Sequence, residues 1–293
     1  MKLTISDLCK NYGQHKALKN LSFVFTPGVY GLLGPNGAGK STLMNIITDN
    51  LQYDSGEIYF TEDEHKITPN TAVFRKKLGF MPQQQGLYPN FTLIRFLYYI
   101  AALKGLSKAQ AKEQIEKLIK IVNLNDFRNK KLGGFSGGMK QRALIAQAML
   151  GEPKVIILDE PTAGLDPKER IRIRNLISEI AFDKIVIIAT HVVSDIEFIA
   201  KEVLLLKKGE IIGHGRPHEL CENVSDKIFE ICTSEDKLAD ISEKYKVGNI
   251  SRDENSIYVR IVSEQPPNGY KFSRAKPTLE DVYLHAFDNE VVV

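Results

Sequence analysis

The sequence contains few cysteines and no spacing that would pair them. Only three of its 293 residues are cysteine, Cys9, Cys221 and Cys232, and no C-x-x-C pattern occurs. An odd number without paired spacing argues against a disulfide framework and against a zinc site. A reducing compartment therefore fits the sequence best.

The chain also lacks an apolar run long enough to cross a membrane. A spanning helix needs about 20 mainly apolar residues, and the longest candidates, 96–103 and 203–206, are far shorter. Charges interrupt the first twenty residues throughout, so no stretch of the signal-peptide type is present. We therefore expect a cytoplasmic N-terminus, and any membrane role would have to come through a partner.

Neither sign of charge is in clear excess. Lysine and arginine number 39 against 36 aspartates and glutamates, a formal net charge of +3, so we expect no nucleic-acid partner. Internal repeats and low-complexity tracts are absent. The length and the hydrophobic content of 43% allow one sizeable domain with a smaller appendage.

Short aliphatic runs are present, each bounded by glycine, proline or charge. They are 29–33, 155–158, 185–189 and 203–206. Such runs are typical of strands buried on both faces of a mostly parallel sheet. Helical patterns lie between several of them, including one through Ile196 and Ile199 that approaches the last run. The sequence therefore predicts an α/β fold.

Two parts of the chain depart from this alternation. From about residue 91 to 150 the pattern is helical, and Ser107 and Gln110 predict a capping box at the start of one helix. Farther on, a strand-like 256–262 and an amphipathic helix from Leu279 stand out. We therefore expect a main domain at 1–215, a helical subdomain within it at about 91–150, and a small α+β domain at 216–293.

A glycine-rich segment follows the first aliphatic run. It fits G-x-x-x-x-G-K-[ST] and consists of Gly34, Pro35, Asn36, Gly37, Ala38, Gly39, Lys40 and Ser41, with Thr42 continuing into a helical pattern. Glycines let successive N–H groups point inward, and a helix start adds about half a positive charge toward a phosphate. Lys40 adds a full charge, and the Ser41 hydroxyl suits Mg²⁺. Because an accidental turn would not need a strand before it and a helix after it, we predict that this segment binds ATP with Mg²⁺.

Two carboxylates end the run at 155–158. Asp159 and Glu160 follow it directly, at the sheet edge where open α/β folds place their ligand chemistry. Asp159 is a candidate for holding Mg²⁺ through water, and Glu160 for polarising the attacking water. The alternative is that both simply end a strand at solvent, and the phosphate-binding segment favours the chemical roles.

Residues 135–142 indicate why the phosphate-binding segment and the two carboxylates occur in one chain. They read Phe135-Ser136-Gly137-Gly138-Met139-Lys140-Gln141-Arg142 and resemble the signature motif of ABC transporter nucleotide-binding subunits, with Phe and Met in place of the commoner Leu and Gln. The resemblance covers residues 1 to about 215 and implies a P-loop NTPase fold of the ABC type. It implies that Ser136, Gly137 and Gly138 contact the γ-phosphate of ATP held by a second subunit. From the residues alone, Ser136 is also a good helix N-cap.

Three other positions match the family one by one. Tyr12 resembles the aromatic residue that stacks on adenine, although a tyrosine packed in a turn is an alternative. Gln83, after Pro82, resembles the glutamine that contacts Mg²⁺ and senses the membrane partner. His191 resembles the histidine that contacts the γ-phosphate, and near a helix N-terminus we expect a neutral ring donating one hydrogen bond there.

The chain also contains a segment similar to the family's loop between the two subunits. Residues 163–166 resemble the family's loop that communicates across the dimer, while Asp166, Pro167 and Glu169 also make a good helix start. Both roles are compatible. The resemblance thus implies that Lys40, Glu160 and His191 are catalytic and that Ser41, Gln83 and Asp159 hold the metal.

The function implied is that of an ATP-hydrolysing transporter subunit. Two cassettes, as a homodimer or a mixed pair, would close around ATP and drive a separate membrane permease. Residues 276–283 look like the closing helix of export-type cassettes of the ABC-2 kind. Tyr98 and Tyr99 belong to the apolar stretch 91–103, for most of which ordinary core packing is the alternative, and they are candidates for facing the permease.

Two other functions compete with this one. A soluble ABC protein of translation or DNA repair usually carries two cassettes or a coiled-coil insertion, and neither occurs in the sequence. A nucleotide sensor without catalysis is disfavoured because Lys40, Asp159, Glu160 and His191 are all intact. We therefore expect an active ATPase.

Overall fold

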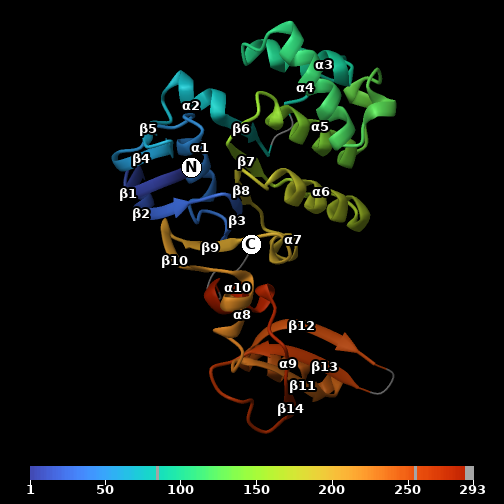
Figure 1. Cartoon of the computed structure of the whole chain (residues 1–293). Coiled ribbons are helices and arrows are strands. Elements are labelled where there is room, and N and C mark those ends of the chain that lie inside the picture. Colours follow the sequence, from blue (N-terminus) through green and yellow to red (C-terminus); the bar gives the residue numbers. More distant parts are fainter. Residues whose placement is uncertain (84–85, 254–255, 288–293) are drawn as a thin grey trace. The chain divides into compact units, whose positions relative to one another are not determined.

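The computed structural model describes residues 1–83, 86–253 and 256–287. The chain divides into two compact units, Met1–Ile212 and Gly213–Val293 (Figure 1). No disulfide joins Cys9, Cys221 and Cys232, which all lie within the described residues. None of the helices within the described residues has the length and apolar character to span a bilayer.

A six-stranded sheet forms the centre of the first unit. Its strand order is β10-β9-β3-β8-β7-β6, and the pairs β3–β8, β3–β9, β7–β8 and β6–β7 are parallel. The bounds are β3 Gly28–Leu33, β6 Leu78–Met81, β7 Val155–Asp159, β8 Ile185–Ala189, β9 Glu202–Lys207 and β10 Glu210–Gly215. Every predicted aliphatic run is a strand of this sheet, which confirms the α/β prediction.

A second sheet in this unit was not predicted. Its order is β2-β1-β4-β5, with β1 Lys2–Tyr12, β2 His15–Phe25, β4 Ser55–Glu62 and β5 His65–Ile67. All three pairs are antiparallel. Alternating residues from it, such as Leu3 and Ile5, pack in one core with the inner side chains of β3 and of the helix after it. This sheet therefore supports the phosphate-binding segment from one side.

The helices of the first unit occupy the predicted places except for α2, which was not predicted. They are α1 Lys40–Ile47, α2 Ala72–Lys77, α3 Leu93–Leu103, α4 Lys108–Ile121, α5 Gly137–Met149, α6 Pro167–Ile180 and α7 Val193–Glu197, with short 3-10 turns at Asn125–Phe127 and Leu132–Gly134. In Figure 1, α3, α4 and α5 form a helical group between β6 and β7 in the sequence, and the capping box of Ser107 and Gln110 opens α4. One expectation was wrong: α7 is a short helix that ends before Ile199.

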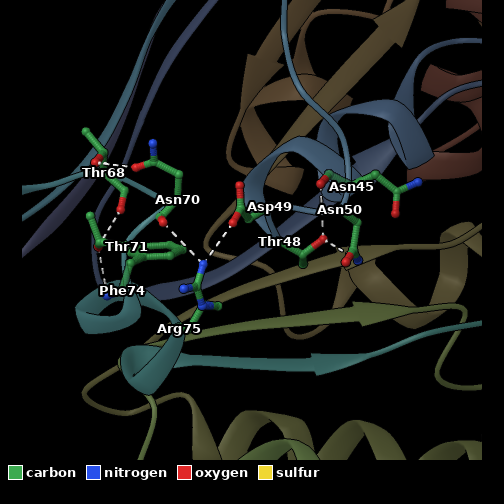
Figure 2. A network of polar contacts seen from close by, with 9 residues as sticks. All are labelled: Asn45, Thr48, Asp49, Asn50, Thr68, Asn70, Thr71, Phe74 and Arg75. Atoms are coloured by element: carbon green, nitrogen blue, oxygen red, sulfur yellow. Dashed lines mark hydrogen bonds and ion pairs between the residues drawn. The ribbon is translucent and has the colours of Figure 1, made fainter.

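The helix that follows the phosphate-binding segment is anchored at its far end. The Thr48 hydroxyl donates back to carbonyl oxygens of α1, and Asp49 turns the chain with a left-handed φ of 60°. Arg75 of α2 donates to the Asp49 carboxylate at 3.0 Å and to the Asn70 carbonyl at 3.2 Å, while Thr71 caps α2 (Figure 2). These contacts hold the end of α1 in place, and the phosphate-binding segment leads directly into the start of the same helix.

The second unit is a small α+β fold. It contains α8 Pro217–Glu222, β11 Ile228–Thr233, a 3-10 turn Glu235–Lys237, α9 Leu238–Lys244, β12 Lys246–Arg252, β13 Ile257–Val262, β14 Lys271–Arg274 and α10 Leu279–Phe287. The antiparallel sheet has the order β12-β13-β11-β14 and packs with α9 around Phe229, Ile231 and Ile261. Only β13 and α10 were predicted. β12 and β14 are largely exposed, whereas β11 is buried and was missed.

Candidate functional site

The glycine-rich segment leaves β3 and enters α1, as the sequence predicted. Gly37 and Gly39 take left-handed φ values of 78° and 108°, a conformation that favours glycine. A side chain at Gly34 would meet the carbonyl oxygen of Leu206 at 2.2 Å, and one at Gly39 would meet that of Ala17 at 2.8 Å. Backbone, not side chains, therefore lines this turn.

The Lys40 ammonium lies inside the turn. Its Nζ donates to the carbonyl oxygens of Gly34 and Pro35. Burial lowers the pKa of Lys40, and the neighbouring carboxylates of Glu160 and Asp159 oppose that shift. A partly buried cation that bonds only to carbonyl oxygens of its own loop is well placed to exchange them for phosphate oxygens.

A pocket of about 210 Å³ collects most of the predicted residues. It is lined by Tyr12, His15, Ala17, Asn36, Gly37, Ala38, Gly39, Lys40, Ser41, Thr42, Gln83, Asp159, Glu160 and His191. Gly34 and Pro35 contribute through the carbonyl oxygens that hold Lys40. The carboxyl ends of three neighbouring parallel strands, β6, β7 and β8, thus meet the phosphate-binding turn at one edge of the sheet.

The pocket offers oxygen donors suited to a hard divalent cation. Ser41 has a hydroxyl, Gln83 an amide oxygen and Asp159 a carboxylate, and all three line the same space. Burial raises the pKa of Asp159 to about 6, with Glu160 adding to the shift and Lys40 opposing it. A carboxylate that is disfavoured in this way gains from a bound cation, so the residues fit Mg²⁺.

Glu160 is held by the strand next to its own. Its backbone takes a left-handed φ of 50°, and its N–H donates to the Ala189 carbonyl at 2.8 Å. The carboxylate accepts from the Thr190 hydroxyl at 3.0 Å and from the His191 N–H at 3.1 Å. Only 11% of the side chain is exposed, so these contacts fix the carboxylate beside the pocket.

The His191 ring lies against the same carboxylate. Its Nδ1 is 2.9 Å from Glu160 Oε1, while 70% of the side chain stays exposed. Because a carboxylate accepts, the shared proton belongs to Nδ1, and a neutral ring then has no proton on Nε2. The expected neutral ring donating to a phosphate does not fit this conformation, since its one proton is already used and α7 begins only at Val193.

Tyr12 reaches the pocket from the end of β1. It pairs across a tight turn with His15, the first residue of β2, and 49% of it is exposed. The alternative of a tyrosine packed into a turn therefore does not describe this side chain. A large exposed ring beside the phosphate-binding turn is suited to stacking on a base.

The signature segment lies elsewhere in the unit. Ser136 caps α5 by accepting from the Met139 N–H at 3.3 Å, as its interpretation as an N-cap predicted. Ser136 and Gly137 are exposed, and neither they nor Gly138 line the pocket. The structure therefore does not bring these three residues to the phosphate-binding turn of their own chain.

Two residues of the site were not predicted. His15 lines the pocket opposite Tyr12, and Thr190 orients both the Glu160 carboxylate and the Val192 N–H. The two-residue turn after Tyr12 would have indicated the first, since it pairs the flanking residues. Thr190 has no sequence signal beyond its place after β8.

Known proteins share both the sequence and the fold. The family model described as ABC transporter matches residues 18–163. The chain is 34% identical, over 96% of its length and 98% of theirs, to an uncharacterized ABC transporter ATP-binding protein, YxlF, of Bacillus subtilis. It is 29% identical, over 99% and 94%, to the Nod factor export ATP-binding protein I of Rhizobium etli.

A solved structure agrees. The dimeric ATP-binding cassette MJ0796, in a post-hydrolysis state with ADP and Pi, superposes with a TM-score of 0.63 at 28% identity, over 73% of this chain and 98% of that one. Fold, pocket and nearly full-length similarity agree with the resemblance noted in the sequence. The chain belongs to the ATP-binding proteins of ABC transporters, and it is an ATPase.

Proposed function

We propose that the pocket binds ATP with Mg²⁺ and that the residues lining it divide the chemistry among them. The backbone of residues 34–39 and the Lys40 ammonium bind the phosphates, and Tyr12 stacks on the base. Ser41, Gln83 and Asp159 would hold Mg²⁺, which neutralises charge on the phosphates when bound. The observation that carries this proposal is the convergence of all these side chains on one pocket of about 210 Å³.

Glu160 is the proposed general base. Its carboxylate lies at the pocket wall, fixed by Thr190 and His191, where it can accept a proton from a water aligned with the terminal phosphate. Lys40 stabilises charge on the phosphate oxygens during transfer. We assign His191 to the orientation of this base: its Nδ1 proton is donated to the Glu160 carboxylate, and a hydrogen bond to the phosphate would require a proton on Nε2 as well.

The site needs a second chain to be complete. Ser136 and Gly137 are exposed and, with the buried Gly138, form a helix start away from the pocket. A helix start with free N–H groups favours an anion. We infer that they contact ATP held by another cassette, a second copy or a related chain. Two cassettes then enclose two nucleotides, and ATP favours that closed state because only there are the contacts complete.

A membrane permease is the proposed partner of the helical group. A groove of about 370 Å³ beside β6 is lined by aromatic and aliphatic side chains, among them Tyr88, Phe96, Tyr99 and Leu103. Tyr98 and Tyr99 are 38% and 39% exposed. Such a surface suits an apolar helix of a permease, which would keep the chain at the cytoplasmic face of the membrane. Because a relative is named for Nod factor export, export is the direction we propose.

The experiment that tests the catalytic assignment is ATP hydrolysis by Glu160→Gln. Loss of the base should lower turnover by about 10²- to 10⁴-fold while ATP binding, measured by fluorescence titration, persists. Glu113→Gln, on the exposed face of α4, is the matched control and should hydrolyse at the normal rate. Undiminished turnover in Glu160→Gln would remove Glu160 from the mechanism.

A further inference from the structure

A buried ion pair joins the signature helix to the helix that follows the inter-subunit loop. Arg142 of α5 and Glu169 of α6 lie with Nε and Oε2 3.5 Å apart, and their side chains are only 10% and 14% exposed. These two atoms have no hydrogen-bond partner among the described residues. Taking charges out of water is costly unless they are paired, so the two side chains join α5 and α6 at a defined place, which we call the junction.

Gly138 leaves the space that Glu169 occupies. A methyl group at Gly138 would meet the Glu169 carboxylate at 2.3 Å and its Cγ and Cδ at 2.8 Å. Gly138 is buried and belongs to the first turn of α5. The Glu169 side chain therefore rests directly on the signature segment, and a side chain at Gly138 would have to displace it.

Arg142 extends the junction to a third helix. Its Nη1 donates to the carbonyl oxygens of Val122 and Asn123 at 3.0 and 2.9 Å, just past the end of α4. Glu169 is also paired with Arg172 on its own helix. The ends of α4 and α6 are thus both tied to α5, and α5 and α6 lie side by side in Figure 1.

The junction lies beside the two segments that, in the proposed two-chain site, contact the partner's nucleotide. Glu169 is in the first turn of α6, directly after residues 163–166, and Gly138 is in the first turn of α5, directly after Ser136. Neither Arg142 nor Glu169 lines the pocket of its own chain. A change at the junction would therefore move the groups offered to another chain while leaving the phosphate-binding turn in place.

We propose that Arg142 and Glu169 are positioning residues for catalysis in trans: they hold the signature segment in register with the loop 163–166 so that the cassette completes the site of its partner. This inference rests on the proposed two-chain site. It adds that the alignment of the signature segment with residues 163–166 depends on a buried charge pair that does not line the nucleotide pocket.

The first measurement compares Glu169→Gln and Arg142→Lys with Glu179→Gln, an exposed position on the same helix. A misplaced reacting group costs about 10- to 100-fold in rate, so both junction variants should lose turnover to that extent. Their affinity for ATP, titrated with a fluorescent analogue, should stay within about twofold because the pocket is intact. Glu179→Gln should behave as the unmodified chain.

Where a lone buried charge prevents folding, the double variant Arg142→Met with Glu169→Met removes both charges together. Thermal unfolding identifies folded samples. A folded double variant with normal turnover would overturn the proposal, because the pair would then be replaceable by any packing of similar volume. A folded double variant with slow turnover and normal ATP affinity supports it.

The decisive measurement is complementation between two deficient chains. Glu160→Gln lacks the base but offers an intact signature segment, whereas Glu169→Gln offers a displaced segment but keeps its base. An equal mixture should regain about a quarter of the normal rate, since half the dimers are mixed and each has one complete site. Ser136→Arg mixed with Glu160→Gln is the parallel control.

The results of the two mixtures distinguish a failure of the junction from a failure of the two-chain site. Recovery in both mixtures supports the junction as a device acting on the partner. Recovery with Ser136→Arg but not with Glu169→Gln overturns the junction and leaves the two-chain site standing. Recovery in neither mixture contradicts the two-chain site itself, and with it the inference.

Discussion

Among single residues, Asp159 has a carboxyl group whose surroundings clearly disfavour its charged form. Burial and Glu160 raise its pKa to about 6 against the opposing effect of Lys40. The folded protein therefore binds a proton at this site, between pH 4 and 6, that the unfolded chain has already lost. Stability contributed by the protonated form is present at the acid end and is lost as the pH rises through about 6.

Asp159→Asn should consequently stabilise the nucleotide-free protein at pH 7, where the carboxylate is charged, and have little effect at pH 4. Melting temperatures at the two pH values measure this. A variant that melts lower than the unmodified chain at pH 7 would show that the charge is already compensated.

Proton competition at the same carboxylate governs metal binding. In the unmodified chain, Mg²⁺-dependent ATP affinity should be constant above pH 6 and fall by up to about tenfold per pH unit below it, because a proton must leave before the cation binds. Titrations with and without Mg²⁺ at each pH isolate the metal's share. Affinity that is flat from pH 7 to 5 would contradict the role of Asp159.

Substitutions at Tyr12 test whether its ring binds the adenine of ATP. Its ring is half exposed at the pocket edge, and stacking on a base is worth about 1–3 kcal/mol by alanine substitution. Tyr12→Ala should weaken ATP binding by roughly 5- to 100-fold, whereas Tyr12→Phe should retain affinity because the ring face remains. Equal affinity in both variants would mean that the base does not rest on this ring.

The sequence was most informative for residues whose chemistry is tied to a short motif. Residues 34–42 could be placed because strand, turn and helix follow one another directly. Glu160 and His191 could be placed only at strand ends, and their mutual contact of 2.9 Å depends on which strands are neighbours. That adjacency of β7 and β8 is a long-range property that no local pattern contains.

On the scale of elements, Lys104 ties the helical group to the sheet. It follows α3 as its C-cap, and its Nζ donates to the Leu78 carbonyl of β6 at 3.3 Å and to the Leu150 carbonyl after α5 at 2.6 Å. Burial lowers the pKa of Lys104 to about 8. The folded protein therefore holds fewer protons than the unfolded chain between pH 8 and about 10.5.

Stability should then rise with pH across that window, by at most about 1.4 kcal/mol per pH unit. Urea unfolding at pH 7.5 and 9.5 measures the rise. Lys104→Met should abolish it, while Lys112→Met, at an exposed position of α4, should keep it. A rise that survives in Lys104→Met would assign the effect to other groups.

Strands could be predicted from the sequence where both faces of the strand are buried. The runs that became β3, β7, β8 and β9 are continuous because helices or a second layer cover both faces. The strands β1, β2 and β4 alternate buried and exposed positions instead, and bulges in β1 interrupt even that alternation. β12 is largely exposed and β14 entirely so, so neither carries an apolar pattern to read.

For the whole molecule, the main consequence of the proposed function is that one chain would hold half of each reaction site. The pocket has the phosphate-binding turn, the metal donors and the base, yet the exposed start of α5 has no nucleotide of its own to serve. The single phosphate-binding segment in the sequence pointed the same way. The resemblance implied that the two halves belong to different chains, and in the structure Ser136, Gly137 and Gly138 at the start of α5 do not line the pocket.

The most direct test of this account is the mass of Glu160→Gln in solution, by light scattering with and without Mg²⁺ and ATP. Without nucleotide the chain should have its monomer mass of 33.0 kDa, and with ATP it should reach twice that value, because hydrolysis no longer releases the closed pair. Adding Ser136→Arg to the same chain should prevent the doubling while ATP still binds. A mass that stays at 33.0 kDa with saturating ATP would contradict the shared site.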